Sequence, residues 1–187
     1  MKKIILASNS KARLKLLQDS GYEVVSQATD IDEISTLSEP HDIVEDLALQ
    51  KLNAYIKSFG KPTSSVVLAA DTMIFFENRL IGKANTEKEA YNTLKLLSNS
   101  LHQIYSSYAL YIPEFGIKSG YDVVDINFKS LSDLTIMTYL ACGEWKGAAG
   151  SYRIQGKGKA LIERINGEFS IAVGLPLKAI SALIELS

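Results

Sequence analysis

Residues 66–76 read Val-Val-Leu-Ala-Ala-Asp-Thr-Met-Ile-Phe-Phe, a nearly unbroken apolar run that carries one acidic residue, Asp71. Such a run predicts an interior strand that is covered on both faces of its sheet. A carboxylate inside a buried strand is unfavourable unless a cation, a metal ion or several hydrogen-bond donors accompany it. Because ligand sites gather at the carboxyl ends of interior strands, we interpret Asp71 as a candidate functional residue. A purely structural ion pair at the rim of the sheet is the alternative interpretation.

The segments around this run predict strands and helices in mixed order. Strands are expected at 4–7, 22–28, 102–112, 117–128 and 161–165, and helices at 11–18, 42–59, 86–98, 132–143 and 177–186. The dipeptide Asn166-Gly167 predicts a hairpin that leads into a further strand at 169–173. We therefore expect an α/β fold with a mixed, twisted sheet and flanking helices, formed by one domain over residues 1–187 with two lobes around a cleft.

The composition narrows the classes of function. Of the 187 residues, 47% are hydrophobic and 22% are charged, which is ordinary for a globular protein. The net charge of −1 gives no global field that would attract nucleic acid or an anionic membrane, so an anionic ligand must be held by local positive charge. The lone cysteine, Cys142, allows no intrachain disulfide, and we interpret it as a packing residue. No apolar stretch reaches membrane-spanning length, and the run at 4–7 is too short for a signal peptide, so we expect a cytoplasmic protein.

A lysine lies in the apolar face of the longest predicted helix. The residues spaced as one helix face are Val44, Ala48, Lys51, Tyr55 and Phe59. Two interpretations of Lys51 are open. Its stem packs on the core while its ammonium group reaches water, or the ammonium group points into a cleft and meets phosphate.

The turn after the first predicted strand has the character of an anion-binding site. Ser8-Asn9-Ser10 precedes a helix N-terminus, where the first N–H groups lack an intrahelical partner and the helix dipole favours negative charge. Lys11 and Arg13 are unfavourable beside that dipole, and a bound phosphate would offset the conflict. An ordinary capped helix is the alternative.

Three further segments carry weaker signals. Asp30, Asp32 and Glu33 offer oxygen ligands for Mg²⁺, although a solvated loop is the usual meaning of such a cluster. Gly82-Lys83 and the glycine-rich segment 155–159 combine lysines with glycines that permit close backbone approach. The sequence has no phosphate-binding loop motif, dinucleotide fingerprint, zinc-ligand spacing or nucleophile elbow. The whole inventory of charges suits metal-assisted phosphoryl chemistry.

Over essentially its whole length, the chain resembles the Maf family of nucleoside triphosphate pyrophosphatases. The resemblance lies in short motifs that occur in the family's order and at fitting spacing. These are Leu6-Ala7-Ser8-Asn9-Ser10 with Arg13, Asp32-Glu33, Leu47-Ala48 with Lys51, Ala70-Asp71-Thr72, Gly82-Lys83, Ala149-Gly150-Ser151-Tyr152-Arg153-Ile154-Gln155-Gly156 and Val173-Gly174-Leu175-Pro176.

This resemblance implies an elongated two-lobed fold like that of inosine triphosphate pyrophosphatase, and a homodimer. It implies hydrolysis of a nucleoside triphosphate with Mg²⁺ or Mn²⁺, on the branch that acts on dTTP and UTP or on modified pyrimidine nucleotides. Nucleotide house-cleaning and control of division both stay open as its biological role. The implied catalytic residues are Asp71, Lys51 and Lys83. The implied substrate-binding residues are Ser8, Ser10, Ala12, Arg13, Thr72 and Gln155. The implied metal ligands are Glu33 and Asp71, and whether Asp71 is a general base or a ligand stays open.

The chain departs from the family pattern at several charged positions. Lys11-Ala12 stands where the family has proline and arginine, Ala84 replaces a proline, and Gly147-Ala148 replaces an acidic residue and a lysine. These losses keep a second hypothesis open, a nucleotide-binding regulator of cell division with weak catalysis or none. A third hypothesis, a nucleic-acid-binding domain built on the basic residues of 153–159, is disfavoured by the net charge and the absence of a basic and aromatic stripe.

Overall fold

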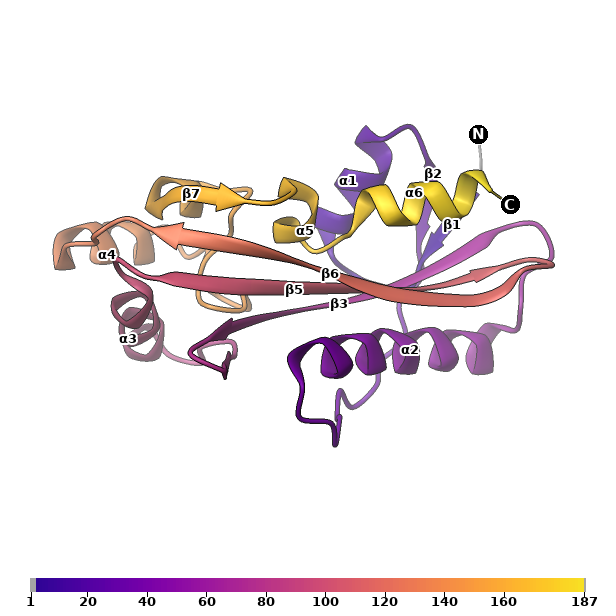
Figure 1. Ribbon diagram of the computed structural model, residues 1–187, viewed down its shortest axis with the longest axis horizontal. Helices are drawn as coiled ribbons and strands as arrows, with labels where there is room; N and C mark the ends of the chain where they lie inside the picture. Colours follow the sequence, from indigo (N-terminus) through magenta and orange to yellow (C-terminus); the bar gives the residue numbers. More distant parts are fainter. Residues whose placement is uncertain (1–2, 187) are drawn as a thin grey trace. The chain divides into compact units, whose positions relative to one another are not determined.

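The computed structural model describes residues 3–186 and shows a mixed α/β fold (Figure 1). Within these residues, the strands are β1 (Lys3–Leu6), β2 (Glu23–Ser26), β3 (Val66–Phe76), β4 (Arg79–Ile81), β5 (Leu101–Ile112), β6 (Gly116–Phe128) and β7 (Ile162–Asn166). The helices are α1 (Lys11–Asp19), α2 (Pro40–Phe59), α3 (Glu87–Leu97), α4 (Asp133–Leu140), α5 (Phe169–Val173) and α6 (Leu177–Glu185), and η1 (Lys157–Leu161) is a 3-10 helix.

The seven strands form one hydrogen-bonded sheet in the order β2-β1-β3-β5-β6-β7, with β4 paired to β3. β1 runs parallel to both β2 and β3, whereas β4 is antiparallel to β3 and β7 is antiparallel to β6. The predicted mixed sheet is therefore confirmed. The apolar run at 66–76 forms β3 with the predicted bounds.

The chain divides into two compact units. The first unit takes in the chain up to Asp71, Ser106–Asp122 and the chain from Gly174 onward, and the second takes in Thr72–Tyr105 and Val123–Val173. The division passes through β3, β5 and β6, so each of these strands has residues in both units. The predicted cleft between two lobes stays a prediction.

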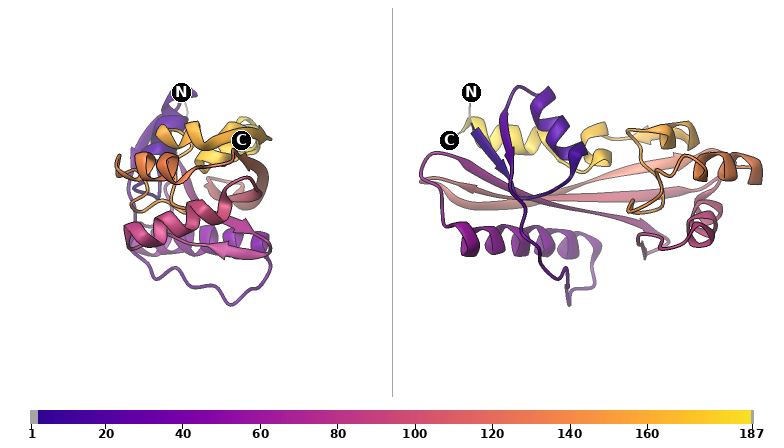
Figure 2. Two further views of the ribbon diagram at one scale, coloured as in Figure 1. Left: turned by 90° about the vertical axis from the view of Figure 1, so that its left-hand side faces the viewer. Right: turned by 180° about the vertical axis from the view of Figure 1, so that it is seen from behind.

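In the first unit, helices cover both faces of the sheet (Figures 1 and 2). Successive residues of a strand point to opposite faces. Val66, Leu68 and Ala70 accordingly pack in one cluster with residues of α1 and α6. Val67 and Ala69 pack in another cluster with residues of α2. The same alternation directs the next residue of that row, Asp71, toward α2.

Helix α2 spans 20 residues and begins at Pro40, two residues before the predicted start. Proline suits the first helical position because its missing N–H has no intrahelical acceptor there. Gly60, with φ of 80°, ends the helix. Val44, Ala48 and Tyr55 are buried as the stripe predicts, whereas Phe59 is half-exposed. Within residues 3–186, no helix has the length and apolarity that crossing a membrane requires.

The second unit has its own core, built on α3, α4, η1, β7 and α5. A polar pair lies within it: His102 Nε2 is 2.7 Å from the hydroxyl oxygen of Tyr152, and Phe128 packs edge-on against both rings. His102 is 1% exposed, and its Nδ1 has no hydrogen-bond partner among the described residues. Burial lowers the pKa of His102 to about 4. The imidazole is therefore neutral in the folded protein at neutral pH.

The prediction of a strand at 169–173 is wrong, because Phe169–Val173 forms helix α5. The preceding segment forms β7 as expected, but β7 pairs with β6 and not with the segment that follows it. A short apolar run has no periodicity that separates a strand from a helix. Here the helical form buries Ile171 and Ala172 in the core of the second unit.

His102 should make the stability of the protein depend on pH. Between pH 6.5, the ordinary value for histidine, and about 4, the unfolded chain binds more protons than the folded chain, so the free energy of unfolding falls as the pH falls. We expect a loss of about 2 kcal/mol from pH 7 to pH 5 due to this residue. Urea unfolding at both pH values should show this difference in the wild-type protein and in His41→Gln, a control at a half-exposed histidine. His102→Gln should lack it, and equal slopes in both variants would contradict the assignment.

Candidate active site

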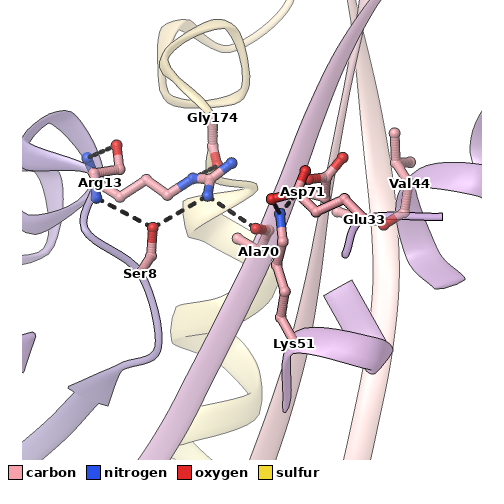
Figure 3. A network of polar contacts seen from close by, with 10 residues as sticks. Ser8, Arg13, Glu33, Val44, Lys51, Ala70, Asp71 and Gly174 are labelled. Carbon is pink, nitrogen blue, oxygen red and sulfur yellow. Dashed lines mark hydrogen bonds and ion pairs between the residues drawn. The ribbon is translucent and has the colours of Figure 1, made fainter. Parts of the chain in front are cut away.

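Asp71 and Lys51 form a nearly buried ion pair between the interior strand and α2. Lys51 Nζ lies 2.6 Å from Asp71 Oδ1, and the two side chains are 14% and 7% exposed, respectively (Figure 3). The second carboxylate oxygen, Asp71 Oδ2, is buried and has no hydrogen-bond partner within residues 3–186. A buried carboxylate oxygen without a donor is unfavourable unless something else binds there. The ion pair is present, and it satisfies only one of the two oxygens of the Asp71 carboxylate.

Lys51 also reaches a second carboxylate. Its Nζ lies 3.0 Å from Glu33 Oε1, so the ammonium group stands between two acidic side chains (Figure 3). Glu33 is 48% exposed, so this pair faces solvent on one side. Of the two interpretations of Lys51, the one in which its ammonium group reaches water is excluded, because that group contacts two carboxylates and the side chain is 14% exposed. The arrangement places one cation and two carboxylates together beside the middle of β3.

Gln50, the residue before Lys51, ties the acidic loop to α2. Its Nε2 donates to the backbone carbonyl of Ile34 at 2.8 Å and to Asp46 Oδ2 at 2.8 Å. Ile34 follows Glu33 directly in the chain. The bond therefore holds the loop next to the carboxylate that contacts Lys51. Sequence analysis could not predict this contact, because its acceptor is a backbone carbonyl.

The turn between β1 and α1 is built by serine side chains. Ser10 is the N-cap residue of α1, and its hydroxyl oxygen accepts from the backbone N–H of Arg13. Ser8 Oγ accepts from the backbone N–H of Ser10 at 3.2 Å. The first-turn N–H groups of Lys11 and Ala12 have no acceptor within the helix, as at any helix start. The predicted cap is confirmed, and the predicted anion binding stays a prediction.

Arg13 reaches from α1 to the backbone beside Asp71. Its Nη1 donates to the carbonyl of Ala70 at 2.8 Å, and its Nε donates to the carbonyl of Gly174 at 3.0 Å (Figure 3). Burial lowers the pKa of the Arg13 guanidinium, while the carboxylates of Asp71 and Glu33 raise it. Arginine suits this place because its planar group presents several donors at fixed angles. Sequence analysis missed this structural role, since both acceptors are backbone atoms.

Three predicted site residues lie in the second unit. Thr72 follows Asp71 in β3 and is half-buried, and Gln155 is exposed just before η1. Lys83 is exposed and forms an isolated antiparallel bridge with Ala149. This bridge connects two of the segments that carry family motifs. The structure thus gathers Ser8, Arg13, Glu33, Lys51 and Asp71 within the first unit, and it holds Lys83 and the 149–156 segment together within the second.

The carboxylates of the first unit suit a hard divalent cation only if other ligands complete its shell. Asp71 Oδ2 is a buried oxygen without a donor. The carboxylate of Glu33 lies near that of Asp71, because both contact the ammonium group of Lys51. Among residues 3–186, no group of three or more histidine, cysteine, aspartate or glutamate side chains is arranged around one point. Mg²⁺ commonly takes one or two carboxylates together with water and substrate phosphate oxygens. The donor set fits that mode, and it does not fit a cage made of protein atoms alone.

Comparison with known proteins finds relatives along nearly the whole chain. Residues 3–186 match the family described as Maf-like protein. A dTTP/UTP pyrophosphatase of Bacillus cereus (strain ATCC 10987 / NRS 248) is 38% identical over 178 residues, which cover 95% of this chain and 86% of that protein. A dTTP/UTP pyrophosphatase of Bacillus mycoides (strain KBAB4) is 38% identical over 180 residues, which cover 95% and 91%. The solved structure of the Staphylococcus aureus Ham1 protein has a TM-score of 0.47 at 19% identity, over 68% of this chain and 72% of that one, which is too distant to support an argument.

Replacing Arg13 by lysine should destabilise the protein by about 1–3 kcal/mol. A lysine ammonium group cannot donate in the same fixed geometry to the carbonyls of Ala70 and Gly174, so at least one buried acceptor loses its donor. Urea unfolding of Arg13→Lys should show the loss. Arg79→Lys, at an exposed arginine of β4, is the matched control and should unfold like the wild-type protein. Indistinguishable stability of the two variants would show that the Arg13 bonds contribute little.

Proposed function

This chain belongs to the Maf family, and on this basis we propose that it is a nucleoside triphosphate pyrophosphatase, which hydrolyses a nucleotide to its monophosphate and pyrophosphate. The observation that carries the proposal is the buried Asp71–Lys51 pair at an interior strand, with one carboxylate oxygen left without a donor. Attack by water on a phosphate requires an oxygen that accepts the proton and a fixed cation that stabilises the developing negative charge. We further propose dTTP and UTP as the preferred substrates, because the curated relatives carry these names.

In the proposed reaction, Asp71 Oδ2 accepts a proton from the attacking water. The oxygen of that water forms a bond to the α-phosphorus, and the bond from the α-phosphorus to the bridging oxygen of the β-phosphate breaks, so that pyrophosphate leaves. Lys51 holds Asp71 through Oδ1, so that Oδ2 is the oxygen left to accept the proton. Arg13 fixes the Ala70 carbonyl, and with it the backbone that carries Asp71. Positioning and electrostatics supply most of the rate enhancement in such a site.

The remaining predicted residues have roles in nucleotide binding under this proposal. The start of α1, with Ser8, Ser10 and Ala12, offers N–H groups and hydroxyls to phosphate oxygens. Lys83 contributes positive charge, and Thr72 and Gln155 contribute groups that recognise the base. Mg²⁺ or Mn²⁺ would neutralise charge on the phosphates when bound, held by Glu33 and, in the alternative in which Asp71 is a ligand and not the base, by Asp71 as well. The homodimer and the cytoplasmic location stay predictions.

Replacing Asp71 by asparagine should lower the rate of pyrophosphate release by at least about 100-fold, because the amide cannot accept the proton from water. The test is an assay of pyrophosphate and orthophosphate with dTTP, UTP, CTP, ITP, 7-methyl-GTP and ATP. Asp19→Asn, at an exposed aspartate of α1, should retain the wild-type rate. Near-normal turnover in Asp71→Asn would refute the catalytic role. Binding of nucleotide without any pyrophosphate release by the wild-type protein would favour the regulator hypothesis.

Removal of divalent cations should abolish pyrophosphate release, and added Mg²⁺ or Mn²⁺ should restore it. Glu33→Gln should need at least about tenfold more Mg²⁺ for half-maximal rate, since changes even at outer-shell groups weaken metal binding by that factor. Glu39→Gln is the matched control, because Glu39 lies just before α2 and its side chain does not cap that helix. An unchanged Mg²⁺ requirement in Glu33→Gln would remove Glu33 from the metal site.

A further inference from the structure

The glycine-rich segment Gln155–Lys159 is packed closely against other protein atoms. A Cβ placed on Gly156 would lie 2.5 Å from Glu144 Oε2 and 2.7 Å from Glu144 Oε1. A Cβ placed on Gly158 would lie 2.5 Å from the carbonyl oxygen of Arg153. Atoms cannot approach so closely without a shift. Packing against the backbone therefore requires glycine at position 158, whereas at position 156 a larger residue would have to displace the Glu144 carboxylate.

The carboxylate that occupies the space beside Gly156 belongs to Glu144, in the loop after α4. Glu144 Oε2 accepts from the backbone N–H of Lys157 at 2.8 Å. Lys157 is the first residue of η1, where an N–H lacks a partner within the helix. A carboxylate is well suited there because a charged acceptor makes a stronger hydrogen bond. Glu144 thus fixes the backbone directly after Gln155.

A second set of bonds runs in the opposite direction between the same two segments. Arg153 Nε donates to the carbonyl of Glu144 at 3.0 Å, and its Nη2 donates to the carbonyl of Lys146 at 2.9 Å. The backbone N–H of Arg153 donates to the Tyr139 hydroxyl at 3.1 Å. Each segment therefore binds the backbone of the other through a charged side chain. Such reciprocal bonds hold a loop more rigidly than one bond alone.

The residues around Gln155 are anchored in the core of the second unit, whereas Gln155 is exposed. Tyr152 and Ile154 are 5% and 3% exposed, and Tyr152 contacts the buried His102. The Gln155 amide offers both a donor and an acceptor, as pairing with the edge of a nucleobase requires. Uracil and cytosine present donor and acceptor in opposite order at that edge. A fixed backbone limits the positions that the Gln155 amide can take against a base, which favours one of the two orders over the other.

We propose that Glu144 is a positioning residue for nucleotide selection, which fixes Gly156 and Lys157 and so directs the amide of Gln155 toward the base. This proposal rests on the proposed function, because it requires a nucleotide bound at Gln155. Glu144 itself does not touch the nucleotide. Its loss is therefore expected to reduce the discrimination between bases in a protein that still folds.

The test compares binding of two non-hydrolysable nucleotides, α,β-imido-dUTP and α,β-imido-dCTP, by calorimetry in the presence of Mg²⁺. The wild-type protein should bind the uracil nucleotide more tightly. Glu144→Ala should lower the dissociation constant for the cytosine nucleotide, divided by that for the uracil nucleotide, by about tenfold. Glu144→Gln retains an acceptor oxygen and should keep most of the preference. Glu163→Ala removes an exposed glutamate of β7 with the same change of charge and should behave like the wild-type protein. Among these three variants, hydrogen exchange at the Lys157 amide should be faster only in Glu144→Ala.

A double-mutant cycle of Glu144→Ala and Gly156→Ala tests the proposal without relying on one variant alone. Gly156→Ala should displace the Glu144 carboxylate and reproduce the loss of base preference seen in Glu144→Ala. Once the carboxylate is absent, the added methyl group has no clash with it, so the double variant should be no worse than either single variant. Additive effects of the two changes would overturn the proposal.

The remaining outcomes distinguish the positioning role of Glu144 from the proposed hydrolysis. If the Lys157 amide exchanges faster in Glu144→Ala while the base preference is unchanged, the positioning role is wrong. A wild-type chain that binds both analogues equally, or neither, overturns it as well. If the preference falls as expected but the wild-type protein releases no pyrophosphate, the positioning role stands and the proposed hydrolysis fails.

Discussion

The ion pair between Asp71 and Lys51 is the interaction on which the first unit of this protein depends. It joins the middle of an interior strand to the middle of α2, with 2.6 Å between the charged atoms. Without Lys51, a carboxylate would stand unpaired in a nearly buried position, and without Asp71, an ammonium group would lie in the apolar face of a helix. A hydrophobic pair would satisfy packing equally well. The ion pair is therefore weak evidence for stability, and the reaction proposed above gives its two charges a use.

The surroundings of that pair are arranged to hold the backbone as well as the side chains. Arg13 comes from α1, on the opposite face of the sheet from α2, and binds the carbonyl of Ala70. Gln50 ties the acidic loop to α2 next to Glu33. The carboxylate of Asp71 is thus set by contacts from two helices, and one of its oxygens still lacks a donor. Such preorganisation is what electrostatic catalysis requires, because the groups need not move when charge develops.

In the second unit, the same principle appears in the clamp between Glu144 and Arg153. Each of these side chains binds the backbone of the other's segment, and Gly156 and Gly158 permit the close approach. The buried pair of His102 and Tyr152 anchors the same segment from the core. Rigid support below an exposed Gln155 is typical of a group that recognises a ligand, since a mobile side chain loses entropy on binding.

The sequence by itself determined that position 71 places a charge inside an interior strand and that Lys51 interrupts an apolar helix face. It also determined the order of nearly all strands and helices, because hydrophobic periodicity and capping residues are local signals. Only the tertiary structure decided that these two charges meet, since they lie 20 residues apart and pair through the packing of α2 on β3. It also decided that Phe169–Val173 is a helix, because the packing of Ile171 and Ala172 overrides a short run without periodicity. The bonds of Arg13, Gln50 and Glu144 end on backbone atoms, which leave no trace in the sequence, so only the folded chain reveals them.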